Sequence, residues 1–136
     1  MDFSLNDEQD LIRQTARDFA QRELAPKAAA RDLSSEFPFA ELEALAELGL
    51  MGVNVPEAYG GSEAGAMAFS VVMQELAKAD ASVAVTVSVT NMVAELISAF
   101  GTEEQKKRYV SKLTSGEAVC GAFALASRRL GRIHRR

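Results

Sequence analysis

The chain has 136 residues, of which 48% are hydrophobic and 25% charged, the composition of a single soluble globular domain. Its formal net charge is −4, but five of the 15 basic residues follow Ser127, so the body of the chain is more acidic and should bind neither nucleic acid nor a membrane. No apolar run approaches the roughly 20 residues of a membrane span, and no signal peptide is evident, so we expect a cytoplasmic protein. The single cysteine and single histidine, Cys120 and His134, argue against a metal cage or a Ser-His-Asp site.

Helical signals fill the first part of the chain. Asn6 can cap a first helix that continues to Asp32, and Pro26 predicts a kink or a restart inside it. A second helix is predicted to open at residues 37–39 and to end at Gly49, with an inner apolar row. That row consists of Phe39, Leu42, Leu45 and Leu48.

A loop and a third helix follow. Residues 51–65 carry Asn54, Pro56 and the pair Gly60–Gly61, which is typical of a connecting loop. The glycine pair could hold a phosphate, but we favour a plain turn because no Lys-Ser or Lys-Thr pair opens a helix beside it. The next helix has apolar residues at helical spacing, namely Phe69, Val72, Met73 and Leu76.

Residues 82–89 permit two interpretations. Their valines alternate with alanine, threonine and serine, which locally predicts a β-strand. A helix would point these valines in every direction, which suits only a helix buried on nearly all sides. We favour this central buried helix, because a helical apolar pattern continues to Gly101. The pattern comprises Val89, Met92, Val93, Leu96, Ile97 and Phe100.

The last clear helix begins at Thr102, whose hydroxyl can form a capping box with Gln105. We expect it to end at Gly116. Its inner face is Tyr109, Val110 and Leu113, and its predicted ion pairs between residues four apart are Glu103–Lys107 and Glu104–Arg108. Residues 118–125 then look like the opening of a strand that has no partner in this chain.

Groups that could perform catalysis are scarce. No spacing places a nucleophile or base beside a group that would adjust its pKa or reactivity, and no metal-binding cluster is evident. Glu75 and Glu95 lie beside apolar rows, where a buried carboxylate would have a raised pKa. We favour exposed positions for both, since glutamate is almost never fully buried unless it is paired.

Six short segments occur in the order and spacing of one enzyme family. They are Asn6–Gln9, Gly49–Gly52, Val55–Gly61, Gln74–Ala77, Gly101–Lys107 and Gly121–Leu125. Together they resemble the N-terminal part of an acyl-CoA dehydrogenase, over essentially the whole chain from Met1 to Leu125.

The resemblance implies an all-α domain over residues 1–117, an orthogonal or up-and-down bundle of about five helices, with residues 118–125 opening a middle β-domain. A C-terminal helical domain would complete the subunit, with FAD and acyl-CoA between the parts. In this family a glutamate base takes the α-proton of the thioester while the β-hydrogen leaves as hydride to the flavin. That glutamate belongs to the C-terminal domain, so no catalytic residue is expected in this chain. The implied partners are an electron-transferring flavoprotein and further copies of the subunit in a homotetramer.

The resemblance stops after Leu125. Family members continue with a Ser/Thr-Glu pair and a Gly-Ser-Asp turn around the flavin pyrophosphate, whereas residues 126–136 form a basic tail. Synonymous codons can be chosen for residues 125–136 so that one added base gives Leu-Ser-Glu-Pro-Glu-Ala-Gly-Ser-Asp-Pro-Ser-Ala, which matches the family motif. We therefore expect that one base has been lost, that the tail is out-of-frame translation, and that the chain is a truncated enzyme.

Candidate site residues follow from the resemblance by position. It implies flavin contacts from Phe123 and Leu125, and from Ala126, where the family has a Ser/Thr hydroxyl. It also implies that the valine-rich helix lines the fatty-acyl cavity with Ala84, Val85, Ser88 and Met92. The alternative for these four is an ordinary core, because a pocket wall and a core share the same apolar chemistry. The alternative function is a non-catalytic helical module that binds acyl chains or partner proteins.

Overall fold

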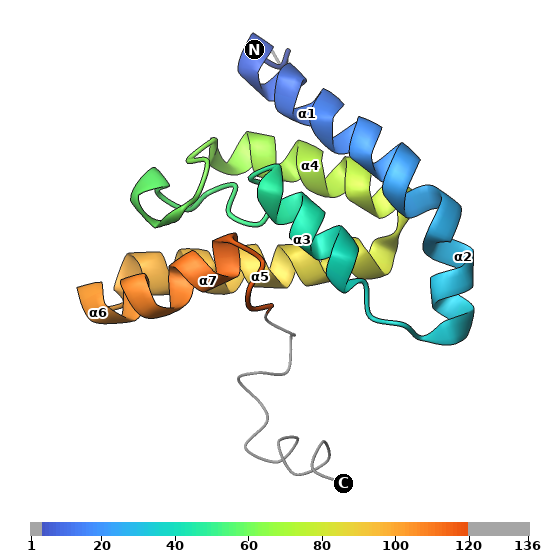
Figure 1. The fold of residues 1–136 in the computed structure, drawn as a ribbon. Coiled ribbons are helices and arrows are strands. Elements are labelled where there is room, and N and C mark those ends of the chain that lie inside the picture. The colour runs from blue at the N-terminus through green and yellow to red at the C-terminus, as the bar shows by residue number, and fades with distance from the viewer. Residues whose placement is uncertain (1–3, 120–136) are drawn as a thin grey trace, which may run out of the picture.

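The computed structural model describes residues 4–119. Within that range the chain has no β-strand and forms five continuous helical segments (Figure 1). The all-α prediction is therefore confirmed. The elements are α1 (Asp7–Phe19), the π-helical turn η1 (Ala20–Leu24), α2 (Ala25–Ser34), α3 (Phe39–Glu47), the 3-10 turn η2 (Glu57–Tyr59), α4 (Gly65–Ala79), α5 (Ala81–Phe100), α6 (Glu103–Gln105), the π-helical turn η3 (Lys106–Val110) and α7 (Ser111–Thr114).

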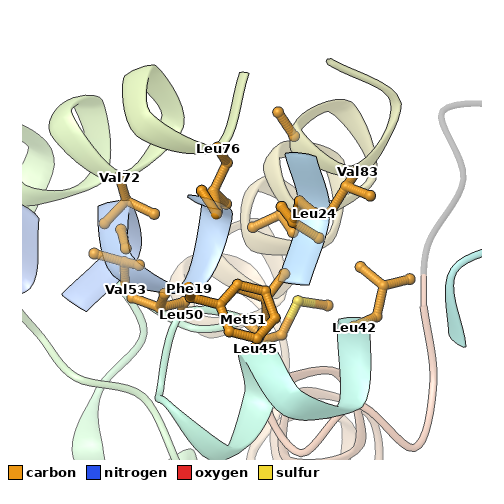
Figure 2. Close-up of a cluster of buried hydrophobic side chains, with 14 of the residues drawn as sticks. Phe19, Leu24, Leu42, Leu45, Leu50, Met51, Val53, Val72, Leu76 and Val83 are labelled. Carbon is orange, nitrogen blue, oxygen red and sulfur yellow. The ribbon is translucent and has the colours of Figure 1, made fainter. Parts of the chain in front are cut away.

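The helices pack in sequence around a main core cluster, with a smaller cluster between α5, η3 and α7. α1 lies on α4 and α4 lies on α5, while η3 and α7 run along the other end of α5 (Figure 1). Side chains from α1, η1, α3, α4, α5 and the loop after α3 meet between them (Figure 2). The labelled members of this core cluster are Phe19, Leu24, Leu42, Leu45, Leu50, Met51, Val53, Val72, Leu76 and Val83.

The first helix begins and bends where predicted. The Asn6 side chain accepts a hydrogen bond from the backbone N–H of Gln9 at 2.8 Å, and the Gln9 side chain accepts one from the Asn6 N–H at 3.2 Å. Pro26 has no N–H to donate and its ring would meet the carbonyl four residues earlier, so the preceding turn, η1, is the wider π-helix. The helix then continues two residues past its predicted end, to Ser34.

The second helix differs from its prediction in which residues it buries. Leu42 and Leu45 are in the core, but Phe39 is 68% exposed and Leu48 is also exposed. Phe39 begins α3 and its ring lies 4.6 Å from that of Phe37 at the open corner between α2 and α3. Leu48 follows the last residue of the helix. The ends of a nine-residue helix therefore leave the core.

The valine-rich segment is helical, so the β-strand alternative is wrong. The expectation that α5 is buried on nearly all sides is also wrong, since its outer face is open. α5 is 20 residues long, its most apolar 18-residue window has a mean hydropathy of 1.6, and among the described residues it alone is long and apolar enough to cross a membrane. Serine, threonine and asparagine interrupt its apolar residues, so no continuous apolar run marks this helix in the sequence. The core helix of a globular domain passes the same test, and α5 packs against α4, η3 and α7.

The last helical segment begins with the predicted capping box. The Thr102 hydroxyl accepts from the Gln105 N–H at 3.3 Å, and the Gln105 side chain accepts from the Thr102 N–H at 2.9 Å. The predicted ion pairs of Glu103 with Lys107 and of Glu104 with Arg108 are absent from this described segment. Glu103 pairs instead with Lys106 at 3.1 Å.

Candidate functional site

Three of the four candidate acyl-lining residues share one face of α5. Val85, Ser88 and Met92 follow one another at intervals of three and four residues, which places them on one side of a helix. The side chains of Val85 and Met92 are 59% and 57% exposed, and Ser88 is half-buried. Ala84 lies instead in the core cluster. We call the exposed side of the helix, defined by Val85, Ser88 and Met92, the open face of α5.

The open face continues to the end of the helix with large apolar residues that we had placed inside. Leu96 and Phe100 are 49% and 84% exposed. They border a groove of about 330 Å³ whose other lining residues are Ile97, Gly101, Gln105 and Tyr109. Glu95, the one charged residue of α5, is exposed as predicted. Periodicity could not identify the open face, because apolar residues occur all around α5.

Asn91 holds the inner face of α5 against the loop after α3. Its amide nitrogen donates to the carbonyl oxygens of Leu50 at 3.1 Å and Val87 at 3.0 Å. Its Oδ1 atom accepts from the backbone N–H of Val53 at 2.7 Å. Asn91 is buried, and a buried amide needs such partners. A single asparagine in an apolar helix is the sequence signal that could have revealed this role.

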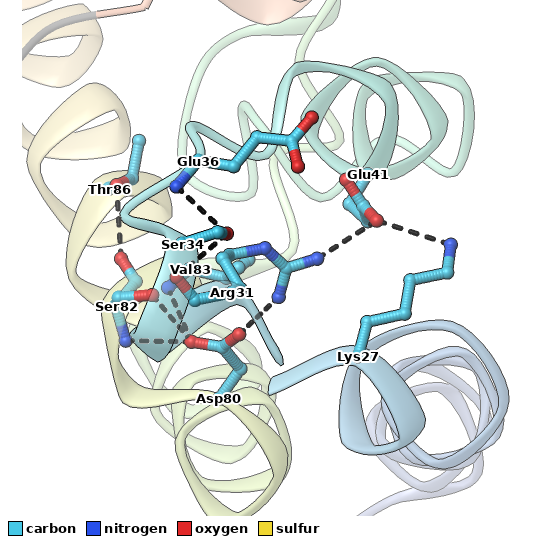
Figure 3. A network of polar contacts seen from close by, with 9 residues as sticks. All are labelled: Lys27, Arg31, Ser34, Glu36, Glu41, Asp80, Ser82, Val83 and Thr86. Atoms are coloured by element: carbon cyan, nitrogen blue, oxygen red, sulfur yellow. Dashed lines mark hydrogen bonds and ion pairs between the residues drawn. The ribbon is translucent and has the colours of Figure 1, made fainter. Parts of the chain in front are cut away.

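Charged side chains hold the other end of α5 (Figure 3). Asp80, the one residue between α4 and α5, caps α5 by accepting from the N–H groups of Ser82 at 3.0 Å and Val83 at 3.2 Å. Its second carboxylate oxygen accepts from the buried guanidinium of Arg31. Arg31 also pairs with Glu41 of α3 at 2.9 Å. The charged network therefore joins α2, α3 and the start of α5.

These two carboxylates stay ionised. Burial alone would raise the pKa of Asp80, but the hydrogen bonds from the first turn of α5 and from Arg31 outweigh it and hold the pKa below its ordinary value. Burial also raises the pKa of Glu41, but hydrogen bonds from the Glu41 backbone N–H and from Lys27, together with the charge of Arg31, outweigh burial and lower this pKa. Neither group is a base poised to take a proton near neutral pH.

Glu75 is not where the sequence interpretation placed it. It is 6% exposed and joins α4 to α1 rather than facing solvent. The Nε and Nη2 atoms of Arg17 donate to its two oxygens at 3.1 and 3.0 Å, and Lys78 donates at 3.0 Å. The bonds from Arg17 outweigh burial and, with Lys78, lower the pKa of Glu75 to about 2. The raised pKa considered for a buried carboxylate is therefore wrong as well.

The Gly60–Gly61 turn has a structural cause. Gly60 has a φ of +82°, and a Cβ atom on Gly61 would lie 1.9 Å from the carbonyl oxygen of Val55. The backbone approaches so closely that only glycine fits at position 61, which explains the glycine pair as a structural turn. Residues 4–119 also contain no group of three His, Cys, Asp or Glu side chains that could hold a metal ion.

The predicted flavin contacts Phe123, Leu125 and Ala126 lie outside the described residues. The basic tail and most of the predicted strand also lie outside them. Ala118 and Val119 are described, and neither belongs to a strand. The flavin contacts, the strand and the out-of-frame tail stay predictions.

Known proteins resemble this chain in both sequence and fold. Residues 6–117 match the family described as Acyl-CoA dehydrogenase, N-terminal domain. The mitochondrial short-chain specific acyl-CoA dehydrogenase of Bos taurus is 44% identical over 117 residues, which are 85% of this chain and 28% of that protein.

Solved structures share the helical arrangement. Butyryl-CoA dehydrogenase from Megasphaera elsdenii has a TM-score of 0.79 and 36% identity, covering 88% of this chain and 32% of that one. A chain from a structure described as the electron transferring flavoprotein of Acidaminococcus fermentans has a TM-score of 0.83 and 33% identity, with the same coverage of 88% and 32%. This chain thus spans 28% to 32% of the length of these relatives. It belongs to the acyl-CoA dehydrogenase family, and its residues 6–117 are the N-terminal helical domain of that family.

Proposed function

We propose that this chain forms one wall of the acyl-CoA site of an FAD-dependent enzyme that dehydrogenates an acyl-CoA thioester between its α and β carbons. The observation that carries the proposal is the open face of α5, where Val85, Ser88 and Met92 stand side by side. The face is apolar, with small side chains at its start. Such a surface is complementary to a fatty-acyl chain.

Residues 4–119 supply binding surface rather than chemistry. The buried carboxylates are committed to ion pairs, Glu75 with Arg17 and Asp80 with Arg31. We therefore assign no catalytic residue to residues 4–119. The proposed electron acceptor is an electron-transferring flavoprotein and the proposed assembly is a homotetramer, both on the family likeness.

A non-catalytic helical module is the second candidate. The same open face and the groove beside Leu96 and Phe100 would bind an acyl chain without any flavin. The two candidates differ in what the purified chain does. If the chain is one wall of an incomplete site, added FAD should not remain bound to it, and acyl-CoA should not reduce a dye. A colourless protein that binds acyl-CoA tightly would favour the module.

A chimera tests the role of the open face directly. Residues 1–117 of this chain would replace the corresponding segment of the Megasphaera elsdenii butyryl-CoA dehydrogenase. Val85→Trp in this chimera should raise KM for octanoyl-CoA more than for butyryl-CoA, because a longer chain needs more of the cavity. Leu11→Trp is the matched control, since Leu11 is equally exposed but on α1. A chimera that binds FAD and responds alike to both variants would contradict the proposal.

A further inference from the structure

We propose that Arg31 is a positioning residue for the acyl-facing start of α5, and that it acts through Asp80. The inference rests on the proposed function of the open face. Arg31 belongs to α2, and its two ion-pair partners, Asp80 and Glu41, are not candidate acyl-lining residues. What it contacts is the one residue that connects α4 to α5.

The two oxygens of the Asp80 carboxylate have separate partners (Figure 3). Oδ1 accepts from the N–H groups of Ser82 and Val83 and from the Ser82 hydroxyl at 2.6 Å, and so closes the first turn of α5. Oδ2 accepts from Nη1 of Arg31. One oxygen therefore sets the start of the helix, and the other attaches that start to α2.

Arg31 is itself fixed in place. Its side chain is buried, and its Nη2 atom pairs with Glu41 of α3 at 2.9 Å. Lys27, one turn earlier on α2, pairs with the same oxygen of Glu41 at 3.2 Å. The guanidinium is thus held between a carboxylate of α3 and the carboxylate that caps α5. A planar group with several donors is suited to this double contact.

The open face begins close to this attachment. Val85 is five residues after Asp80 and Ser88 is eight, so both lie within about 12 Å of it along the helix axis. A cleft of about 560 Å³ beside the network is lined by Arg31, Asp80, Ser82 and Thr86, among others. Without Arg31, the freed oxygen of Asp80 could turn toward water in this cleft. That rotation would take the helix cap with it and move the first turns of α5.

The test uses amide hydrogen exchange in the full chain, with urea unfolding to report global stability. Arg31→Met keeps the aliphatic length and removes the charge, while Asp80→Asn keeps a capping oxygen and removes the ion pair. Arg31→Met should speed exchange at residues 84–88 at least tenfold more than at α1 amides. In an Asp80→Asn background, the same change should add less than a twofold effect.

Lys27→Met is the matched control, because it removes a charge from Glu41 without touching Asp80. It should leave exchange at residues 84–88 within twofold of the unmodified chain. The proposal is overturned if exchange there changes in step with α1 and α4, or if Arg31→Met has its full effect without the Asp80 carboxylate. These measurements need no ligand. Failure of the proposed function would appear in a separate experiment, in which Arg31→Met is introduced into the chimera described above. If amide exchange in α5 then becomes faster but the ratio of KM for octanoyl-CoA to KM for butyryl-CoA does not change, the proposed function fails while the positioning role of Arg31 stands.

Discussion

Replacing Asn91 by leucine should destabilise the fold strongly although the two side chains have the same branching and the same number of heavy atoms. The change removes the partners of two backbone groups outside α5, the N–H of Val53 and the carbonyl of Leu50. Each buried backbone group left without a partner costs about 1–3 kcal/mol, so for two groups we expect a loss of about 2–6 kcal/mol in the free energy of unfolding. Domains of this size are stable by about 5–15 kcal/mol, so the loss would be a large fraction of the total.

Urea unfolding followed by circular dichroism measures this loss. With a slope of about 2 kcal/mol per molar urea, in the middle of the usual range, the midpoint of Asn91→Leu should fall by about 1–3 M. Ser98→Ala is the control on the same helix, because it removes a hydroxyl that bonds only to the Ala94 carbonyl, at 2.7 Å. It should change stability by less than about 0.5 kcal/mol. If Asn91→Leu unfolds at the same midpoint and slope as the unmodified chain, the two backbone groups find other partners and the reasoning is wrong.

Three further changes probe other parts of the fold. The pKa of Glu75 is lowered from 4.5 to about 2, so its ion pairs stabilise the fold above about pH 4.5 and lose this effect as the pH falls toward 2. Because its partner Arg17 is half exposed, Glu75→Gln should cost only about 1–2 kcal/mol in the free energy of unfolding at neutral pH. The same change should flatten the pH dependence of the melting temperature between pH 4.5 and 2. Gly61→Ala brings a Cβ atom within 1.9 Å of the Val55 carbonyl oxygen and should cost about 2–4 kcal/mol in the free energy of unfolding measured with urea. Gly65→Ala is the control: its Cβ would meet no atom within 4 Å, but its φ of +86° should still cost about 1 kcal/mol. Equal losses for the two variants would contradict the close approach at Gly61. Thr102→Ala should cost about 1 kcal/mol and speed amide exchange in α6 before any other helix.

Features with a local cause were predictable from the sequence. The capping boxes at Asn6 and Thr102 join residues three apart, so their side chains meet as soon as the helix forms. The bend before Pro26 follows from the missing N–H of proline. Gly49 ends the second helical region with a φ of +74°, a conformation that glycine adopts without strain.

Features with a distant cause were not predictable. Glu75 is buried because Arg17, 58 residues earlier, meets it across two helices, and no local pattern records that meeting. Phe39 belongs to a helical apolar row but lies at a corner where the row leaves the core. The open face of α5 is apolar like the inner face, so periodicity could not tell them apart. Family likeness named Ala84, Val85, Ser88 and Met92 as acyl-lining residues; the last three share the open face, Ala84 lies in the core, and the lining itself stays a prediction.

The order of segments along the chain has a consequence for α5 during synthesis. η3 and α7, which cover the last part of its inner face, follow it, but α4 and the loop after α3, which cover the first part, precede it. When α5 leaves the ribosome, these partners have already emerged and can shield one side of the most apolar segment at once. The opposite side has no such early partner. Nascent chains that stall when α5 has just emerged from the ribosome should therefore recruit chaperones through that uncovered side.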